Sequence, residues 1–237
     1  MLLAGKNSAS FYKDGQEVFI PGTELFKSFW KFSVEGFPDF ECYPNRDSKP
    51  YRDIYGIPEC GTVIRGTLRN QGWCEKIKKL VDLGYVEEAI SNVGGLSYAT
   101  LTAKLINADA NKDLVAQTAA FLKVPVDSHV ISAFKWLGLF DHGEVVPADM
   151  NNNLDALSLL MRKKMTLQPH ERDLMVLRHT FVAEYADRTE NITSTLIDYG
   201  FPNGDTSMAR TTSLPLAIVT RMVLEKRWTR PGLTIPR

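Results

Sequence analysis

The stretch that decides the fold runs Glu41-Cys-Tyr-Pro-Asn-Arg-Asp-Ser-Lys-Pro50, Tyr51-Arg-Asp-Ile-Tyr-Gly-Ile-Pro-Glu-Cys60, Gly61-Thr-Val-Ile-Arg-Gly-Thr-Leu-Arg-Asn-Gln-Gly72. Its last part predicts a β-strand, because the side chains of a strand point alternately to its two faces. One face would carry Ile64, Gly66 and Leu68, and the other Arg65, Thr67 and Arg69. The second face would therefore present two guanidinium groups and a hydroxyl in line.

Such a donor-only surface suits a carboxylate, because an arginine can hold both carboxylate oxygens at once. The segment Asn45-Arg46-Asp47-Ser48 lies between prolines and predicts a turn. It would add Arg46 as a third arginine, with Asp47 to orient it and Ser48 to donate. This arrangement predicts a substrate with more than one carboxylate. An ion-pair network on a solvated sheet face is the alternative, and the spacing alone leaves both open.

Composition fits an ordinary globular protein with a sizeable core. The chain has 237 residues, of which 44% are hydrophobic and 24% charged, with 28 basic and 28 acidic side chains. This balance gives no indication of nucleic-acid or membrane partners. The stretch Leu214 to Leu224 is broken by Arg221, so we expect no membrane span.

The three cysteines, Cys42, Cys60 and Cys74, are scattered and odd in number, which favours a reducing, cytoplasmic compartment. The four histidines lie far from them in sequence and form no ligand pattern. We therefore expect no metal site.

Strand signals lie at both ends of the chain. The first residues predict a short helix running into a hairpin at Asp14-Gly15. Residues 25–43 predict a short helix and a strand. Residues 173–185 and 192–199 predict a long hairpin, and residues 208–227 predict a final helix that Thr206 or Ser207 would cap.

The middle of the chain predicts helices only. Apolar residues recur at helical spacing in about five short segments between residues 71 and 168. The simplest architecture is α+β: a discontinuous α/β domain of residues 1–70 and 170–237, which carries a helical insertion at 71–169.

Motifs of catalysis and nucleotide binding are absent. There is no Gly-x-Gly-x-x-Gly, phosphate loop, Gly-x-Ser-x-Gly or His-Glu-x-x-His. Asp53, Asp198 and Asp205 are single acids that we expect in solvated turns or caps, and His179 is expected to be structural. We assign no catalytic residue and no cofactor-binding residue to this chain.

Several motifs, in order, resemble saccharopine dehydrogenase of the glutamate-forming type. They are Asn7 to Gly15, Tyr43-Pro-Asn-Arg-Asp-Ser48, Tyr55 to Glu59, Thr62 to Arg69, Lys79 to Gly84, Trp136 to Phe140, Glu171 to Leu177, Ser207-Met-Ala209 and Leu214-Pro215. Departures from the family pattern are Asn70, Trp73 and Gly204-Asp-Thr206.

The resemblance implies a mixed-sheet α/β domain of the glyceraldehyde-3-phosphate-dehydrogenase C-terminal type, which would bind substrate and form a homodimer, with a helical domain over it. The NADP-binding Rossmann half of the family would lie upstream of Met1, so the chain would be a fragment or truncated product that is inactive alone. The whole enzyme would interconvert saccharopine with L-glutamate and 2-aminoadipate 6-semialdehyde in lysine metabolism.

The resemblance also assigns substrate-binding residues. These are Arg46, Thr67, Leu68 and Arg69, which hold the carboxylates of saccharopine. Asn45, Ser48 and Arg65 would support them from behind, and Arg65 would equally suit a structural role. A non-catalytic fragment that dimerises or caps a partner is the alternative. A relative that acts on another amino-acid imine is a third reading, and the motif of residues 45–48 argues against it.

Overall fold

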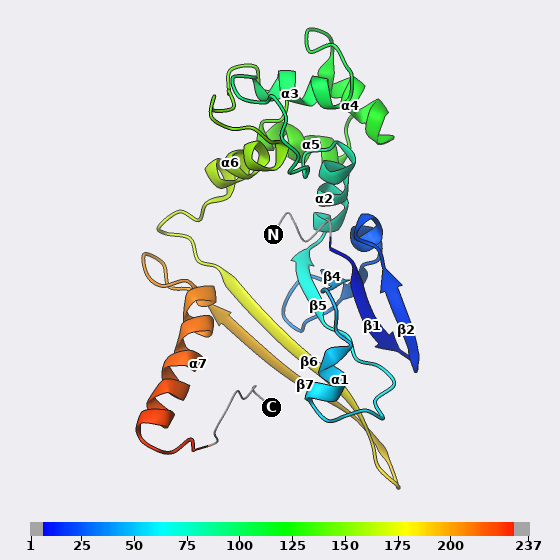
Figure 1. Ribbon diagram of the computed structural model, residues 1–237, viewed down its shortest axis with the longest axis vertical. Coiled ribbons are helices and arrows are strands. Elements are labelled where there is room, and N and C mark those ends of the chain that lie inside the picture. The colour runs from blue at the N-terminus through cyan, green and yellow to red at the C-terminus, as the bar shows by residue number, and fades with distance from the viewer. Residues whose placement is uncertain (1–6, 230–237) are drawn as a thin grey trace. The chain divides into compact units, whose positions relative to one another are not determined.

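The computed structural model describes residues 7–229. They form two compact units, residues 7–165 (unit 1) and residues 166–229 (unit 2). The short helix expected at the start of the chain lies largely outside the described residues. Each unit is described below by itself, and Figure 1 labels the helices and strands of both.

Unit 1 begins with the predicted hairpin. Strands β1 (Ala9–Lys13) and β2 (Gln16–Ile20) pair antiparallel around Asp14 and Gly15, which both have positive φ, of 52° and 79°. Such a pair of left-handed residues matches the twist of a two-residue hairpin. The prediction of a hairpin at Asp14-Gly15 is confirmed.

A three-stranded antiparallel sheet follows. It has the order β3 (Trp30–Phe32), β4 (Phe40–Pro44) and β5 (Gly66–Asn70). A 3₁₀ helix, η2 (Gly22–Lys27), precedes it, and a short helix, α1 (Pro50–Ile54), lies between β4 and β5. Strand β5 starts one residue after Arg65, so Arg65 belongs to the segment that enters the strand.

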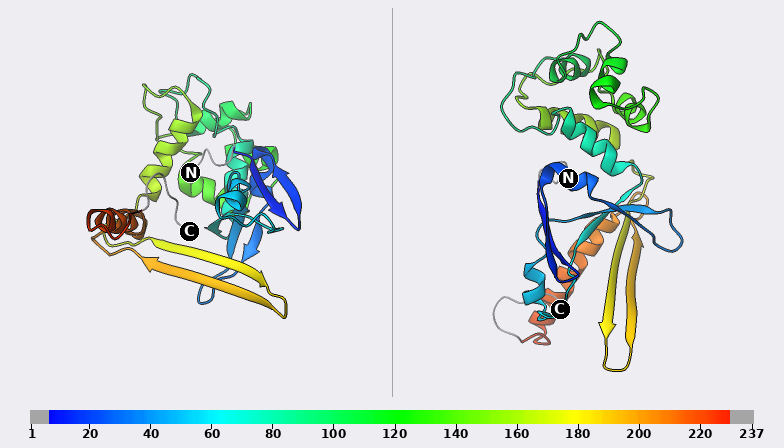
Figure 2. Two further views of the ribbon diagram at one scale, coloured as in Figure 1. Left: turned by 60° about the horizontal axis from the view of Figure 1, so that its bottom comes forward. Right: turned by 90° about the vertical axis from the view of Figure 1, so that its right-hand side faces the viewer.

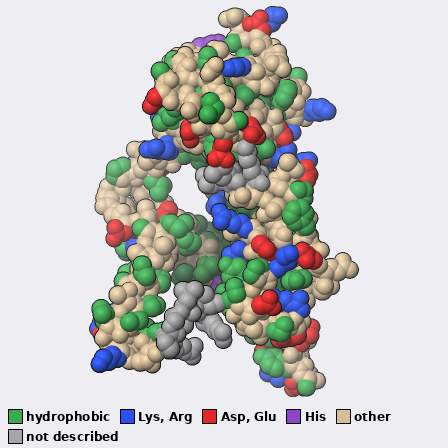
Figure 3. Space-filling model, viewed as in Figure 1, with side chains coloured by type: hydrophobic (Ala, Val, Ile, Leu, Met, Phe, Trp, Pro, Cys, Tyr) green, Lys and Arg blue, Asp and Glu red, His purple; other side chains and the backbone are tan. Residues whose placement is uncertain are grey.

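The five predicted helices are present in unit 1. They are α2 (Trp73–Asp82), α3 (Tyr98–Leu105), α4 (Leu114–Leu122), α5 (His129–Leu137) and α6 (Asn153–Met165). Side-chain oxygens of Ser97, Asp113 and Ser128 accept from backbone N–H groups in the first turns of α3, α4 and α5. Acidic and basic side chains are interspersed over these helices (Figure 3).

The core of unit 1 joins its helices to its strands. Leu25 and Phe26 of η2 and Tyr43 of β4 are buried with apolar residues of α2, α3, α5 and α6, and the Phe26 and Tyr43 rings meet edge to face at 5.0 Å between centroids. This contact packs β4 against η2, and the shared core joins both to the helices.

Unit 2 consists of a long hairpin and one helix. Strands β6 (Leu174–Glu184) and β7 (Thr189–Tyr199) pair along all their residues, and α7 (Ser207–Leu224) contacts β6. Figure 2 shows the hairpin as an extended two-stranded ribbon. The predicted hairpin and final helix are confirmed, although β7 begins three residues earlier than predicted and α7 ends three residues earlier.

Unit 2 leaves its apolar side chains uncovered. Among residues 166–229 no large hydrophobic side chain is buried, and both faces of the hairpin carry exposed ones. Leu177, Phe181, Ile192 and Leu196 share one face by register, whereas Leu174, Val182, Ile197 and Tyr199 share the other. A two-stranded ribbon with two apolar faces needs further partners to be stable in water.

The element content agrees with the predicted α+β class. The assignment of residues 1–70 and 170–237 to one discontinuous domain stays a prediction. Within residues 7–229, no helix combines the length and the apolar content that crossing a membrane requires.

Candidate functional site: one face of the β4–β5 pair and the adjoining turn

The pairing of β4 with β5 places the predicted donors on one face. Thr67 lies opposite Tyr43, and Arg69 lies opposite Glu41. Residues directly opposite each other in an antiparallel pair point to the same side, so Thr67 and Arg69 share a face as predicted. Leu68, opposite Cys42, points to the other face and would meet a ligand on this face through its backbone.

Arg69 has no carboxylate partner in the described part of the chain. Its Nη1 donates to the Leu68 carbonyl oxygen at 3.3 Å, and its guanidinium lies 5.7 Å from the centre of the Trp73 ring. Its Nε is buried without a hydrogen-bond partner, a state it shares with the Nε atoms of other arginines. Most donor positions of this half-buried guanidinium are therefore available to a ligand.

The carboxylate opposite Arg69 is already engaged. Glu41 is buried, with 8% of its surface exposed, and accepts from the N–H groups of Gly72 at 2.6 Å and Cys74 at 2.8 Å. These groups lie at the start of α2, where the helix dipole favours negative charge. Sequence reasoning did not single out Glu41, and its only signal was one acid in a strand of buried aromatic and sulfur side chains.

Arg46 stands exposed on the turn between β4 and α1, and its side chain has no carboxylate partner among residues 7–229. Its φ is +54°, a left-handed conformation that costs a residue with a side chain about 1–2 kcal/mol. Strained backbone of this kind concentrates at ligand sites. The observation therefore supports a functional role for this turn.

The spacing alone gave Asp47, Ser48 and Arg65 direct roles, and the structure gives them other contacts. The supporting role that the resemblance implies for Ser48 and Arg65 stays a prediction. Asp47 does not orient Arg46, because its carboxylate accepts from the Lys49 N–H at 3.0 Å. The Ser48 hydroxyl is buried and accepts from the Arg65 N–H at 3.0 Å, so it supports the sheet from within. Both Nη atoms of Arg65 are bonded to Tyr51 and to carbonyls of the turn, so its guanidinium faces the turn.

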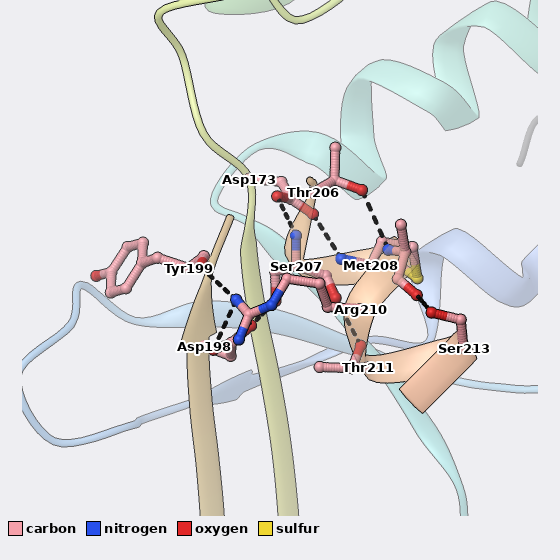
Figure 4. Close-up of polar contacts among 10 residues, drawn as sticks. Asp173, Asp198, Tyr199, Thr206, Ser207, Met208, Arg210, Thr211 and Ser213 are labelled. Carbon is pink, nitrogen blue, oxygen red and sulfur yellow. Dashed lines mark hydrogen bonds and ion pairs between the residues drawn. The ribbon is translucent and has the colours of Figure 1, made fainter. Parts of the chain in front are cut away.

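A second polar cluster lies in unit 2 and fixes α7 to the ends of β6 and β7 (Figure 4). The Asp173 carboxylate accepts from the N–H groups of Ser207 at 2.7 Å and Met208 at 2.9 Å. Asp198, at the end of β7, accepts from the Ser207 hydroxyl at 2.7 Å and from Arg210 at 3.1 Å. Asp198 was expected in a solvated turn or cap; it lies instead in a strand and forms a half-buried ion pair.

This second cluster has a structural role: it attaches α7 to the hairpin. Its carboxylates are satisfied by backbone N–H groups, a hydroxyl and one guanidinium, all from the same unit. The Arg210 guanidinium also stacks 4.3 Å from the centre of the Phe201 ring. Both carboxylates of the cluster are thus engaged within unit 2, and Nη1 of Arg210 is bonded to Asp198 and to the Tyr199 carbonyl oxygen.

The buried thiols are unsuited to act as nucleophiles. Burial raises the pKa of Cys42 to about 12. Burial, together with the nearby carboxylate of Glu41, also raises the pKa of Cys74. A thiol must ionise to attack, and these two stay protonated at neutral pH.

Comparison with known proteins places the chain in one family. The profile of the saccharopine dehydrogenase C-terminal domain matches residues 1–237. A saccharopine dehydrogenase [NADP(+), L-glutamate-forming] of Schizosaccharomyces pombe is 36% identical over all of this chain and 54% of its own length. The enzyme of the same name from Saccharomyces cerevisiae is 38% identical, with the same coverage.

A solved structure and a further relative support the same family assignment. Apo saccharopine dehydrogenase (L-Glu forming) from Saccharomyces cerevisiae matches 98% of this chain and 54% of its own, with a TM-score of 0.89 and 37% identity. Mitochondrial alpha-aminoadipic semialdehyde synthase of Bos taurus is 34% identical over 86% of this chain and 23% of its own length. The chain spans about half the length of the fungal relatives. The predicted family and fold class are confirmed, and the chain belongs to the saccharopine dehydrogenase C-terminal domain family.

Proposed function

We propose that this chain forms the substrate-carboxylate site of an NADP-dependent, L-glutamate-forming saccharopine dehydrogenase, which interconverts saccharopine with L-glutamate and 2-aminoadipate 6-semialdehyde. One observation carries the proposal: Arg46 and Arg69 lack carboxylate partners within residues 7–229, although Glu41 lies directly across from Arg69. Saccharopine carries several carboxylates, and two unpaired arginines on one sheet and its adjoining turn match them in charge.

In this proposal the residues of the site bind the substrate and orient it for the reaction. Arg69 is half-buried beside Trp73, so its interaction with a carboxylate is weakly screened by water. Arg46 is exposed and would approach a second carboxylate from the turn. Thr67, between them on the same sheet, would add a hydroxyl donor. Holding the substrate at several carboxylates fixes the carbon–nitrogen bond that reacts.

The residues described here do not fit the cofactor itself. Two strands lead through a glycine-containing connection into a helix: β5 through Gly72 into α2, and β7 through residues 200–206 into α7. In both, a carboxylate already occupies the N–H groups at the helix start, Glu41 for α2 and Asp173 for α7. A pyrophosphate would meet negative charge at each, so NADP belongs to another part of the whole enzyme in this proposal.

We further propose that the protein is a homodimer of the cytoplasm that associates through unit 2. The support is the uncovered apolar surface of the hairpin, where Phe181 is 53% and Leu196 47% exposed. Cys42, Cys60 and Cys74 are all free thiols, as expected for a reducing compartment.

Calorimetric titration of the chain with saccharopine tests the site. Arg69→Met should weaken binding by about 2–5 kcal/mol, because it strands a carboxylate in a half-buried position. Arg46→Met should cost less, about 1–3 kcal/mol, since Arg46 is exposed. Arg52→Met is the matched control, because Arg52 stacks on Tyr12 and donates to the Pro58 carbonyl oxygen. Equal affinities for all four proteins would contradict the proposal.

The same substitutions test the reaction. In the full-length protein that carries this chain, saccharopine-dependent reduction of NADP should lose kcat/KM in Arg69→Met and keep it in Arg52→Met. Retained affinity without turnover would instead identify a binding module that does not catalyse.

A further inference from the structure

Arg65 holds both sides of the turn that carries Arg46. Its Nη2 donates to the carbonyl oxygens of Asp47 at 3.2 Å and Asn45 at 3.4 Å. These two residues flank Arg46 in sequence. The guanidinium fork is suited to this task, because it presents several donors in one rigid plane.

Tyr51 holds the Arg65 guanidinium in place. Its hydroxyl accepts from Nη1 of Arg65 at 2.9 Å, and its ring centre lies 4.2 Å from the guanidinium carbon. The cation–π stacking and the hydrogen bond act on the same group, so the Arg65 side chain has little freedom. Tyr51 belongs to α1, the helix that follows the turn.

Strand β1 holds the turn from a second direction. The Ser10 N–H donates to the Arg46 carbonyl oxygen at 3.0 Å, and the Ser48 N–H donates to the Ser10 carbonyl oxygen at 2.7 Å. The Ser48 side chain is buried and bonded to the Arg65 backbone. The backbone around Arg46 is thus fixed on both sides, while the Arg46 side chain stands exposed.

We propose that Arg65 and Tyr51 are positioning residues of the substrate site. They hold Arg46 in its left-handed conformation, with φ of +54°, and so aim its guanidinium at a substrate carboxylate. Neither touches the substrate. This inference rests on the proposed function of Arg46, and it assigns Arg65 away from direct carboxylate binding. Lysine should replace Arg65 poorly, because its donors sit on one atom, whereas Arg65 reaches Tyr51 from Nη1 and the two turn carbonyls from Nη2.

A double-mutant cycle on saccharopine affinity tests the coupling. Arg65→Lys should weaken binding on the order of tenfold in the otherwise unchanged chain. In an Arg46→Met background, the same substitution should have almost no further effect, because the residue through which it acts is gone. Equal effects in both backgrounds would overturn the proposal. Arg52→Lys is the matched control, an arginine that also stacks on a tyrosine, and should leave affinity unchanged.

Amide hydrogen exchange gives a readout that needs no ligand. In Arg65→Lys, the N–H groups of Ser10 and Ser48 should exchange on the order of tenfold faster, because both are bonded within the held turn. The Gly15 N–H, bonded to the Gly61 carbonyl oxygen at the far end of the same hairpin, is the internal control. Tyr51→Phe, which keeps the ring and loses the hydroxyl, should show a smaller change of the same kind.

The two readouts separate the two proposals. If the unchanged chain does not bind saccharopine, the proposed function fails, while faster exchange at Ser10 and Ser48 would still support Arg65 as the residue that holds the turn. If saccharopine binds and exchange at these amides does not change in Arg65→Lys, the positioning role is wrong and the proposed function stands.

Discussion

Glu41 and Arg69 lie directly opposite each other on β4 and β5, yet the Glu41 carboxylate bonds to the N–H groups of Gly72 and Cys74 at the start of α2. A neighbouring acid and base would ordinarily pair and neutralise each other. Here the start of α2 binds the Glu41 carboxylate, so the Arg69 guanidinium remains available to a ligand. The charge at the candidate site therefore depends on how α2 is attached to the sheet.

Glu41→Gln should destabilise unit 1 by about 1–3 kcal/mol, because a buried amide cannot accept from both N–H groups with the strength of a carboxylate. Urea unfolding followed by circular dichroism measures this loss. Saccharopine affinity should fall in the same variant if α2 and Trp73 shift relative to Arg69. An unchanged unfolding midpoint would mean that water replaces the carboxylate at the helix start.

The packing of Cys42 on the neighbouring strand leaves no room for a side chain at Gly66, at the start of β5. A Cβ at this position would lie far inside van der Waals contact with Sγ of the buried Cys42. Gly66→Ala should therefore destabilise the protein by about 1–3 kcal/mol, as is usual for overpacking a core. Thermal unfolding measures the effect.

The double variant Gly66→Ala/Cys42→Ala provides the control. Removing Sγ makes room for the new methyl group. The double variant should therefore lose less stability than the two single variants lose when their losses are added. Additive losses would show that the backbone of β5, and not the contact with Cys42, is what excludes alanine.

The sequence was sufficient to predict most strands, because they carry local signals, but it predicted one strand in residues 25–43, where the structure has β3 and β4. Asp14-Gly15 predicts its hairpin. The alternation of Ile64 to Arg69 predicts a strand with its donors on one face, and the strand observed begins at Gly66. The family was also accessible, since the motifs from Asn45 to Ser48 and from Arg65 to Arg69 are specific in type and order.

The contacts of the Arg65 side chain could not be predicted from such local signals. Its role depends on contacts with Tyr51, Asn45 and Asp47, which are 14 to 20 residues away in sequence and are brought close by the path of the chain. Alternation assigns a face to a side chain but not a partner. The same holds for Glu41, whose bonds reach residues more than 30 positions away.

The buried thiols predict how stability changes at alkaline pH. The pKa of Cys42 is raised from 9.0 to about 12 in the folded state, so the unfolded chain loses this proton first as pH rises. The thiol therefore leaves the free energy of unfolding unchanged below pH 9. Between pH 9 and 12 it lowers that free energy by up to about 1.4 kcal/mol per pH unit. Urea unfolding at a series of pH values should show this slope, and Cys42→Ala should reduce it.

Thiol labelling checks the same burial at a single pH. At pH 8 a disulfide reagent should react quickly with one thiol, that of the partly exposed Cys60, and with all three cysteines in denaturant. Rapid reaction of a second thiol in the folded protein would show that β4, which carries Cys42, or the start of α2, which carries Cys74, opens on the timescale of labelling.

The apolar face of the β6–β7 hairpin predicts a charge-sensitive dimer. Leu177, Phe181, Ile192 and Leu196 share this face, so a lysine at Leu196 would place an unpaired charge within a desolvated interface. Leu196→Lys should shift the chain from dimer to monomer in sedimentation velocity, with a weakening of at least about tenfold. Thr189→Lys adds the same charge opposite Glu184 at the end of the hairpin and should leave the dimer intact. A Leu196→Lys variant that still dimerises would place the subunit contact elsewhere, and a chain that is monomeric without substitution would contradict the proposed homodimer.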